Sequence, residues 1–543
     1  MTRPEWLGAR EVPIGLGCMR MPDERAMFET VAAAADAGIT IFDTARAYEG
    51  NERLLARALR RCDADATARI VTKGGMRREG GTWIPDGRAK SIRADCEASL
   101  AALDGLPIDL YLIHAPDPRT PWATAVRALA RLADEGLVGS VGVSNVNRRL
   151  LDEALDLAPT AAVQVALSVL DDTAVRGGVV ERCEDAGIAV IAHSPLGGPR
   201  RAGRLERRRE LAEIAEARGV TAAEVALAWL LDLSPAVVPI TGARRPETAR
   251  SAAQAAEIEL DALERAVLPR PKPLARTRPR AEGEVVLVMG IPGAGKTRIA
   301  EDYVTDGYLR LNRDERGGTL REVAAALDDA LSAGAQRVVL DNTYLSRASR
   351  SYVIEAASRH GVAVRCVWLD TPLAQAQVNL VERLLDRFGR LPTPEELKTA
   401  ARREPGVHTP TSQMRAVREL EPPSTDEGFA RVERVPFERA PSEGGPGVFV
   451  AATALADWNG AGVDRDAPRL VFDWRPGAEA DEAGVCPHPG GPPICWCRPP
   501  LPGLILAFAR EHGVDPRRSV LVGTSAAHRT LATTLGARYS SVG

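Results

Sequence analysis

The clearest chemical pattern in the chain lies near its middle, in EVVLVMGIPGAGKT (residues 284–297). A short apolar run is followed there by residues that fit G-x-x-x-x-G-K-[ST]: Gly290, Gly295, Lys296 and Thr297. These glycines, and Gly293 between them, let backbone N–H groups turn toward phosphate oxygens without a Cβ in the way. Lys296 would reach the β and γ phosphates, the Thr297 hydroxyl would bind Mg²⁺, and the next helix would add its positive dipole end. The pattern predicts a site for a nucleoside triphosphate such as ATP.

Polar side chains with catalytic potential also close most of the short apolar runs in the first half of the chain. From Val12 to about Leu268, amphipathic stretches alternate with the runs VPIGLG, ITIFDTA, ARIVTKG, IDLYLIH, GSVGVSN, AAVQVAL, AVIAHSP and AVVPITG. This alternation predicts a (β/α)₈ barrel, whose active-site face is formed by the carboxyl ends of the strands. The polar residues at those ends are Asp43, Lys73, His114, Ser144, Asn145, Gln164 and His193. Packing alone would not require them there, so we expect a catalytic site.

Three cysteines and a histidine gather in a Pro- and Gly-rich stretch near the end of the chain. Cys486, His488, Cys495 and Cys497 form the pattern C-x-H-x₆-C-x-C. Thiolates and imidazole at this spacing suit tetrahedral Zn²⁺, and four protein ligands leave no open position for catalysis. The pattern therefore predicts a structural zinc site, with a chance cluster as the alternative.

Length and composition place these sites in a multidomain protein. A chain of 543 residues is too long for one core and suggests about three domains. The net charge of −3 gives no overall attraction to nucleic acid or membranes, so any basic surface must be local. The scattered cysteines argue for a reducing compartment. Without a signal-like N-terminus or a run near the ~18 apolar residues of a membrane span, we expect a cytoplasmic protein with no membrane partner.

Two stretches rich in Pro and Gly or Arg divide the chain. Residues 269–283 lack periodicity and are interpreted as an extended linker, or alternatively as a basic strip beside a nucleic-acid groove. APSEGGPG, residues 440–447, precedes the last segment. We therefore expect a barrel at residues 1–268, a P-loop α/β/α domain at residues 284–439 and a small α/β module at residues 440–543.

The barrel segments resemble the aldo-keto reductase family. The resemblance rests on IFDTARAYEGNE, IVTKGG, LYLIHAPDP, GVSN, Gln164 and PITGARRPE, in that order. It implies that Tyr48 protonates the substrate carbonyl oxygen, and that Lys73, salt-bridged to Asp43, lowers the pKa of Tyr48. It also implies that His114 orients the carbonyl while hydride passes from a nicotinamide to carbon. The nicotinamide carboxamide would be held by Ser144, Asn145 and Gln164.

The chain departs from this family's usual pattern at two positions. The family's A-Y-S-P-L segment is AHSPL here, so His193 would stack under the nicotinamide in place of a tyrosine. The E-N pair that usually ends the adenine segment is replaced by RSAA, residues 250–253. Arg244 and Arg245 remain for a 2′-phosphate, which favours NADPH over NADH. A barrel that keeps its tetrad without efficient turnover is the alternative to an active reductase.

The central domain resembles the polynucleotide 5′-kinase family. Besides the phosphate loop, the resemblance rests on GYLRLNRDE, RVVLDNTYLSRASRSYVIEAA and RELEPPSTDEGFARVERVPF. The loop alone would equally suit a gluconate or adenylate kinase. By resemblance, Asp314 is the general base for a 5′-hydroxyl and Arg313 contacts the substrate phosphate. Asp341 would lie where the second loop contacts nucleotide, metal or acceptor.

Phosphoryl transfer also calls for a mobile arginine over the γ-phosphate. Arg383 aligns best with the lid arginine of this family, and Arg387 and Arg390 are the alternatives. The run that holds them, LVERLLDRFGR, is also consistent with an amphipathic helix whose charged face is solvated.

The last segment resembles the zinc-loop branch of the haloacid-dehalogenase (HAD) phosphatases, through the cysteine loop, CRPPLPG and VLVGTSAAH. The two aspartates of that family's first motif are absent from GVFVAATAL, and its lysine after C-R is Pro499. Thr524 and His528 replace the acids of its V-G-D-S-x-x-D motif. Without an aspartyl nucleophile or Mg²⁺ carboxylates, we expect a catalytically inactive, zinc-stapled module.

These observations favour an enzyme that transfers the ATP γ-phosphate to the 5′-hydroxyl end of RNA or DNA in repair. An NADPH-dependent reductase in the same chain would act on a small carbonyl or a sugar aldehyde, such as one left on a damaged sugar. A nucleic-acid ligase is a further candidate partner. The alternatives are a kinase for a small alcohol or sugar, and a kinase whose barrel and C-terminal module are only binding scaffolds.

Overall fold

The computed structural model describes residues 4–6, 12–21, 23–269, 283–437, 443–460, 466–479 and 484–542. The chain divides into two compact units, Met1–Pro273 and Leu274–Gly543. Most of the linker expected at residues 269–283, and the start of the break expected at residues 440–447, lie outside the described residues. Within the described ranges, no helix is long and apolar enough to cross a membrane.

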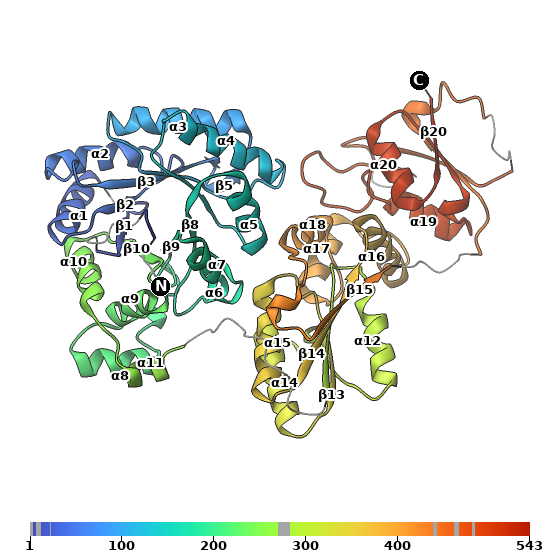
Figure 1. Cartoon of the computed structure of the whole chain (residues 1–543). Coiled ribbons are helices and arrows are strands. Elements are labelled where there is room, and N and C mark those ends of the chain that lie inside the picture. Colours follow the sequence, from blue (N-terminus) through green and yellow to red (C-terminus); the bar gives the residue numbers. More distant parts are fainter. Residues whose placement is uncertain are drawn as a thin grey trace. The chain divides into compact units, whose positions relative to one another are not determined.

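The first unit is a closed barrel of parallel strands surrounded by helices, as the alternating pattern predicts (Figure 1). The strands, in barrel order, are β1 (Gly15–Gly17), β10 (Val237–Thr241), β9 (Ala189–His193), β8 (Thr160–Ala166), β7 (Val141–Ser144), β6 (Leu110–Ile113), β3 (Arg69–Gly74) and β2 (Ile41–Asp43). The α-helices are α1 (Glu24–Asp36), α2 (Asn51–Arg61), α3 (Ala89–Leu103), α4 (Trp122–Asp134), α5 (Arg148–Leu157), α6 (Thr173–Arg176), α7 (Val179–Ala186), α8 (Arg209–Arg218), α9 (Ala222–Leu233), α10 (Pro246–Gln254) and α11 (Ala262–Val267). An antiparallel hairpin of β4 (Met76–Glu79) and β5 (Thr82–Pro85), which the sequence analysis did not predict, is separate from the barrel sheet.

The two-residue period of the strands carries the polar strand ends to the inside of the barrel. Ile41 belongs to a core cluster made almost entirely of strand residues, whereas Phe42 packs in the layer between strands and helices. Successive side chains point to opposite faces, so Asp43 points inward like Ile41. The same spacing places Lys73 after Val71, His114 after Leu112, Gln164 after Ala162 and His193 after Ile191.

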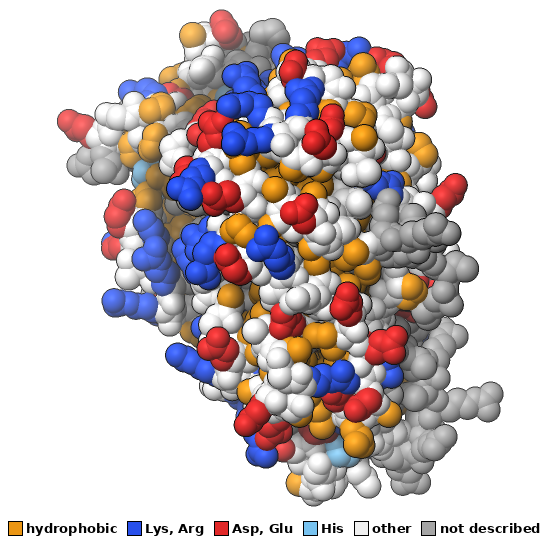
Figure 2. All heavy atoms as spheres, turned by 90° about the vertical axis from the view of Figure 1, so that its left-hand side faces the viewer, with side chains coloured by type: hydrophobic (Ala, Val, Ile, Leu, Met, Phe, Trp, Pro, Cys, Tyr) orange, Lys and Arg blue, Asp and Glu red, His pale blue; other side chains and the backbone are white. Residues whose placement is uncertain are grey.

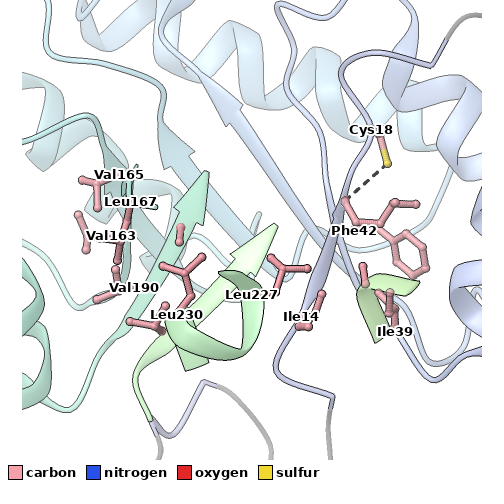
Figure 3. Close-up of a cluster of buried hydrophobic side chains, with 14 of the residues drawn as sticks. Ile14, Cys18, Ile39, Phe42, Val163, Val165, Leu167, Val190, Leu227 and Leu230 are labelled. Atoms are coloured by element: carbon pink, nitrogen blue, oxygen red, sulfur yellow. Dashed lines mark hydrogen bonds between the residues drawn. The ribbon is translucent and has the colours of Figure 1, made fainter. Parts of the chain in front are cut away.

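The outer layer fixes the strands against the helices. Figure 3 shows part of it, with Phe42 and Ile39 at one end and side chains of β8 and β9 at the other, and Leu227 and Leu230 of α9 between them. These residues are almost completely buried. At roughly 25 cal/mol per Å² of buried apolar surface, such a layer is the main source of barrel stability, and it holds the strand ends in place.

The second unit contains two five-stranded parallel sheets. The first has the order β12 (Leu309–Leu311), β13 (Arg337–Asp341), β11 (Glu284–Met289), β14 (Ala363–Asp370) and β15 (Arg431–Pro436). The second has the order β18 (Val485–Cys486), β17 (Arg469–Trp474), β16 (Val448–Ala451), β19 (Val520–Gly523) and β20 (Arg538–Ser541). In both sheets the first strand of the chain is central, as in doubly wound α/β folds, whose ligands bind at the carboxyl ends of the strands.

The helices of the second unit follow these strands in βα order. Those of the P-loop domain are α12 (Lys296–Thr305), α13 (Arg313–Arg316), α14 (Leu320–Ser332), α15 (Arg347–Arg359), α16 (Leu373–Phe388), α17 (Pro394–Arg403) and α18 (Pro410–Glu419). Those of the C-terminal module are α19 (Gly503–Glu511) and α20 (Ala526–Leu535). One core cluster joins α16, α17 and Val407 to the second sheet, α19 and α20, so the module packs on the helices that carry Arg383.

Charged side chains of both signs are mixed over the face shown in Figure 2, where acidic and basic residues lie beside one another. This mixture agrees with the small net charge of −3.

Candidate functional site

A cavity of about 510 Å³ opens at the carboxyl ends of the barrel strands. The polar strand ends that line it are Asp43, His114, Asn145, Gln164 and His193. Tyr48, from the loop after β2, and Trp83, from β5, complete the wall around them. Two further predicted residues, Lys73 and Ser144, are buried behind it and contact Asp43 and Asn145. The barrel thus brings these predicted residues together around one cavity.

Lys73 is held by oxygen atoms at the bottom of this cavity. Its Nζ donates to both carboxylate oxygens of Asp43, at 2.8 and 2.7 Å, and to the Thr44 carbonyl at 2.7 Å. Burial opposes the charged form of Lys73, but Asp43, Tyr48 and Cys18 together outweigh it, so the pKa of Lys73 is raised. Gln164 Nε2 donates to Asp43 at 2.7 Å, so one of its two N–H groups is used there.

Tyr48 lies directly against this charged pair. Lys73 Nζ is 5.5 Å from the centroid of the Tyr48 ring, and the ring meets His114 edge-on with centroids 5.8 Å apart. Burial raises the pKa of Tyr48 and Lys73 lowers it, and the net result is a raised pKa. The expected lowering by Lys73 is therefore present but smaller than the effect of burial. Tyr48 keeps its proton at neutral pH and can donate it to a carbonyl oxygen, after which Lys73 stabilises the phenolate.

His114 is a neutral imidazole. Its pKa is lowered to about 3, first by burial and then by the positive charge of Lys73 and by His193. Its Nδ1 is buried and has no hydrogen-bond partner within the described part of the chain. Leaving a buried nitrogen unpaired costs about 1–3 kcal/mol.

A chain of hydrogen bonds runs along the opposite wall. His193 Nε2 lies 3.1 Å from Asn145 Oδ1, and Asn145 Nδ2 donates to Ser144 Oγ and to the His114 carbonyl, both at 3.0 Å. Asn145 has a φ of 58°, a left-handed conformation that asparagine tolerates better than most residues. Burial is the main reason why the pKa of His193 is lowered. The predicted nicotinamide residues are thus fixed as one group.

The arginines expected to hold a 2′-phosphate lie at the entrance to α10. Arg244 lines the cavity and Arg245 immediately precedes α10. Both side chains are exposed, and neither forms an ion pair with any residue that the structure describes. They are therefore free to contact an anionic group.

The phosphate loop spans the gap between β11 and α12. Gly290, Gly293 and Gly295 have φ values of 155°, 86° and 96°, which favour glycine. A Cβ on Gly293 would lie 2.3 Å from the Ala376 carbonyl oxygen. Side chains from later helices brace the loop: Asn379 Nδ2 donates to the Gly293 carbonyl at 2.8 Å and Gln413 Nε2 to the Pro292 carbonyl at 3.2 Å.

Lys296 lies across this loop. Its Nζ donates to the carbonyls of Gly290 and Ile291, both at 3.0 Å. Burial lowers the pKa of Lys296 to about 8, and nearby Asp341, Arg383 and Asp314 also act on it. The Thr297 side chain is exposed, so its hydroxyl is open to a metal or phosphate.

Asp314 lies in the first turn after β12. Asn312 caps that turn by accepting from the backbone N–H groups of Asp314 at 2.6 Å and Glu315 at 3.3 Å. Arg313 Nη2 donates to Asp314 Oδ1 at 3.3 Å. Asn312 also bonds Asp341 at the end of β13, the strand next to β11, so the turn that carries Asp314 lies at the same edge of the sheet as the phosphate loop.

Asp341, at the end of β13, is 2% exposed. Its oxygens accept from Arg310 at 3.0 and 2.8 Å and from Asn312 Nδ2 at 2.9 Å. The carboxylate that was expected to contact ligand therefore forms a buried ion pair, and Asn312 connects it to the turn that carries Asp314.

The three candidate lid arginines differ in what they contact. Arg387 forms an ion pair with Glu404, and Arg390 forms one with Glu396 at 2.7 Å. Arg383 instead donates to the Gly406 carbonyl at 3.3 Å and acts on the pKa of Lys296 and His408. It also lines a cavity of about 360 Å³ beside Gly293 and Gly295. Of the three, Arg383 is placed to meet a phosphate.

The cysteine cluster is compact. The ligand atoms of Cys486, His488, Cys495 and Cys497 all lie within 4.8 Å of one another. The Cys486 sulfur is 3.8 Å from the Cys495 sulfur and 3.3 Å from that of Cys497. Tetrahedral zinc with bonds of ≈ 2.3 Å separates its sulfurs by about 3.7 Å, so the set fits such an ion.

The ends of β16 and β19 carry no acid at the positions where the phosphatase resemblance would require one. Ala451 is the last residue of β16, and Thr453 lies two residues later in the chain. Its Oγ1 is 2.8 Å from Oγ1 of Thr524, the first residue after β19. His528 accepts a hydrogen bond from the Thr524 backbone N–H at 3.2 Å. Hydroxyls and an imidazole thus occupy the place where the family resemblance would require carboxylates.

Comparisons with known proteins match two segments of the chain. A model of the aldo/keto reductase family matches residues 13–267, and a model of an AAA domain matches residues 285–404. Aldo-keto reductase str7 of Strobilurus tenacellus is 29% identical over 282 residues, which cover 46% of this chain and 82% of that protein. "Probable aldo-keto reductase 1" of Glycine max is 30% identical over 268 residues, 42% of this chain and 76% of that protein. The chain belongs to the aldo-keto reductase family.

Solved structures of aldo-keto reductases also match the reductase domain. The thermostable enzyme Tm1743 is 32% identical, with a TM-score of 0.42, and covers 49% of this chain and 98% of its own. A Klebsiella pneumoniae aldo/keto reductase in complex with NADP and acetate is 26% identical, with a TM-score of 0.41, and covers 47% of this chain and 89% of its own. In this chain the reductase domain is followed by an AAA-type P-loop domain.

Sequence reasoning missed several residues of the reductase cavity. Trp83 meets the rings of Tyr48 and His114 at centroid distances of 6.1 and 5.8 Å. Arg20, from the loop after β1, lines the same cavity and is exposed. The pair Gly80–Gly81 between two short polar-apolar runs is a hairpin signal that could have located Trp83.

His408 is the main residue missed beside the phosphate loop. Burial lowers its pKa to about 4, and Lys296, Arg383, Asp314 and Arg313 all act on it. It therefore lies among the charged residues assigned to phosphoryl transfer. No spacing rule relates it to the phosphate loop more than 100 residues earlier, so the sequence offered no signal.

Proposed function

We propose that the reductase domain transfers hydride from NADPH to an anionic carbonyl compound, with Tyr48 as the proton donor. The observation that carries this proposal is the group at the cavity floor, where a protonated Tyr48 lies against the Lys73–Asp43 ion pair. Bound NADPH would supply the hydride to the carbonyl carbon. The carbonyl oxygen takes the Tyr48 proton, the C=O double bond becomes a C–O single bond, and an alcohol results.

The other residues of the cavity have separate tasks. His114 stays neutral, so it can donate one hydrogen bond to the carbonyl oxygen without competing with Tyr48 as an acid. Asn145 and the Gln164 oxygen would hold the carboxamide of the cofactor, and the His193 ring would lie against its nicotinamide face. Arg244 and Arg245 would bind a 2′-phosphate, which favours NADPH.

Arg20 supports an anionic substrate. It lines the cavity beside Tyr48 and His114, and no acidic residue of the described chain pairs with it. The lining carboxylate, Asp43, is neutralised by Lys73. A phosphate- or carboxylate-bearing aldehyde would therefore be favoured over a neutral one, in agreement with a sugar aldehyde at a damaged nucleic-acid end.

NADPH oxidation with glyceraldehyde 3-phosphate and with glyceraldehyde tests this proposal. We expect a higher kcat/KM for the phosphorylated aldehyde, a loss of that preference in Arg20→Gln, and a 10²–10⁴-fold loss of kcat in Tyr48→Phe. An abasic oligonucleotide should gain two hydrogens in mass with NADPH. Unchanged NADPH oxidation in Tyr48→Phe would contradict its role as the proton donor, and no oxidation by the wild-type chain would favour a barrel that serves only as a scaffold.

We further propose that the P-loop domain is an ATP-dependent polynucleotide 5′-hydroxyl kinase in which Asp314 is the base. The supporting observations are that Arg383 lines a cavity beside Gly293 and Gly295, and that Asn312, which caps the turn of Asp314, bonds Asp341 at the end of β13, the strand next to β11. Asp314 would take the proton of the 5′-hydroxyl, whose oxygen then attacks the γ-phosphorus as the bond to the β-phosphate oxygen breaks. Thr297 would hold Mg²⁺, and Arg383 would contact the transferred phosphoryl group.

The strand order supports separate places for nucleotide and acceptor. Asp314 follows β12 at one edge of the sheet, whereas the 360 Å³ cavity lies toward β14 and β15 near the other. Arg298 and Phe437 in that cavity offer a guanidinium plane and a ring for stacking on adenine. The polynucleotide end would enter beside Asp314, with Arg313 on its phosphate.

Transfer of labelled γ-phosphate to matched 5′-hydroxyl RNA and DNA oligonucleotides tests the kinase, with Asp314→Asn as the inactive control. Binding of single strands that weakens with salt is expected, because phosphate contacts release counterions. Transfer to a small alcohol or sugar but not to oligonucleotides would favour the second candidate. A ligase that seals the 5′-phosphate product remains a proposed partner.

For the last domain we propose a HAD-like module that binds structural Zn²⁺ and has no phosphatase activity. The four-residue ligand set supports the zinc, and the Ala451, Thr524 and His528 strand ends support the lack of catalysis. One equivalent of zinc per chain and no release of phosphate from 3′-phosphorylated oligonucleotides are the expected results.

A further inference from the structure

One short segment of the P-loop domain contacts three functional regions of the second unit. The Gly406 carbonyl accepts from Arg383 at 3.3 Å, and the His408 carbonyl accepts from Trp496 Nε1 at 3.0 Å. Gln413, one helical turn further on, donates to the phosphate loop at Pro292. The segment therefore joins the lid arginine, the phosphate loop and the C-terminal module.

Trp496 lies between two predicted zinc ligands, Cys495 and Cys497, and is 2% exposed. It belongs to the core that joins α16, α17 and Val407 to the C-terminal sheet. Leu391, in the loop after α16, packs on the three cysteines themselves. The cysteine loop is thus packed into the P-loop domain at the base of the helix that carries Arg383.

We propose that Trp496 is a positioning residue for the kinase site: it fixes residues 406–408 and, through them, holds Arg383 over the phosphate loop. This inference rests on the proposed kinase function and gives the inactive C-terminal module a task in it. Within the described residues, the hydrogen bond of Arg383 is to the Gly406 carbonyl. Its position therefore depends on where that carbonyl is held.

The matched test uses two tryptophans of the same module that each donate one N–H to a backbone carbonyl. Trp496→Phe removes the bond to His408, whereas Trp474→Phe removes the 2.8 Å bond to His488 within the cysteine loop. Trp474 is 42% exposed and lies outside the shared core. Reductase activity of the same chain serves as an internal control for both variants.

We expect Trp496→Phe to lower the kinase kcat by about five- to tenfold, the effect of losing one net hydrogen bond. KM for ATP should stay within about twofold, because the phosphate loop keeps its own contacts. Amide exchange of residues 404–411 should rise in this variant and remain unchanged in Trp474→Phe. Removal of zinc by a chelator should raise exchange in the same residues.

A double-mutant cycle distinguishes positioning from general damage. If Trp496 acts through Arg383, Trp496→Phe should cost nothing further in the Arg383→Ala background. Additive losses, or unchanged kcat and exchange in Trp496→Phe, would overturn the inference. If the wild-type chain binds ATP but transfers no phosphate, the kinase proposal fails, whereas the exchange measurement still decides whether Trp496 holds the segment.

Discussion

Replacing Asp43 by asparagine tests whether a buried carboxylate keeps Lys73 charged beneath Tyr48. Lys73 is 1% exposed, and both Asp43 oxygens accept from its Nζ. Burial alone lowers the pKa of a lysine by up to 3–5 units. Without the carboxylate, burial would lower the pKa of Lys73 well below its ordinary value. Lys73 would then be largely neutral at physiological pH.

Two losses follow from that neutral lysine. The phenolate left after proton transfer from Tyr48 loses its stabilising cation, so we expect a fall in kcat of about 10²–10⁴-fold at pH 7.5. The residual activity should rise as the pH is lowered through the new pKa of Lys73, whereas the wild type should not gain. Breaking one side of a buried ion pair should also cost about 3–5 kcal/mol of stability.

The assay is NADPH oxidation from pH 5.5 to 9, together with thermal melting of the full chain. Glu52→Gln is the matched control. Like Asp43, Glu52 is a buried carboxylate, 2% exposed, but it accepts a hydrogen bond from Thr72 Oγ1 at 2.6 Å and none from Lys73. It should retain the wild-type pH profile. If Asp43→Asn keeps the kcat and pH profile of the wild type, Lys73 does not depend on Asp43 for its charge and the reasoning is refuted.

Three further predictions concern the second unit. The pKa of Lys296 is lowered to about 8, so its charge is present below that pH and lost above it. ATP affinity should therefore fall by up to about tenfold per pH unit above pH 8. An ATP affinity that does not change with pH in calorimetry would contradict this. Gly293→Ala should abolish ATP binding while leaving the reductase intact, since its Cβ would lie 2.3 Å from the Ala376 oxygen at a φ that favours glycine. Cys497→Ser should release zinc, as measured by elemental analysis. It should also lower the melting temperature of the second unit, because metal binding is coupled to folding. Full retention of zinc would argue against Cys497 as a ligand.

The sequence predicted the features that depend on local backbone geometry. A strand alternates its faces every two residues, so the apolar Ile41 predicts that Asp43 also points inward, and the same holds for Val71 with Lys73. The phosphate loop was identified from spacing because the glycines themselves allow its backbone path. The barrel, the P-loop domain and the compactness of the Cys486–Cys497 cluster were foreseen for these reasons.

The sequence did not predict which side chains from distant segments contact one another. Gln164 was expected to help hold the cofactor, and the structure adds a hydrogen bond from its amide to Asp43, 121 positions away. Asp341 was expected to face ligand, but Arg310 and Asn312 enclose it. Both contacts depend on which strand ends become neighbours, and that follows from the sheet order rather than from local spacing.

The sequence by itself therefore determined which chemical groups are present and which way each points along its own strand or loop. The tertiary structure alone decided what those groups meet. It places Trp83 edge-on against Tyr48 and exposes the pKa of His408 to the charges of the phosphate site. It also lets Trp496 donate a hydrogen bond to the His408 carbonyl. The physical reason is that side-chain direction is set by local backbone geometry, whereas contacts between distant residues are set by the packing of whole elements around a shared core.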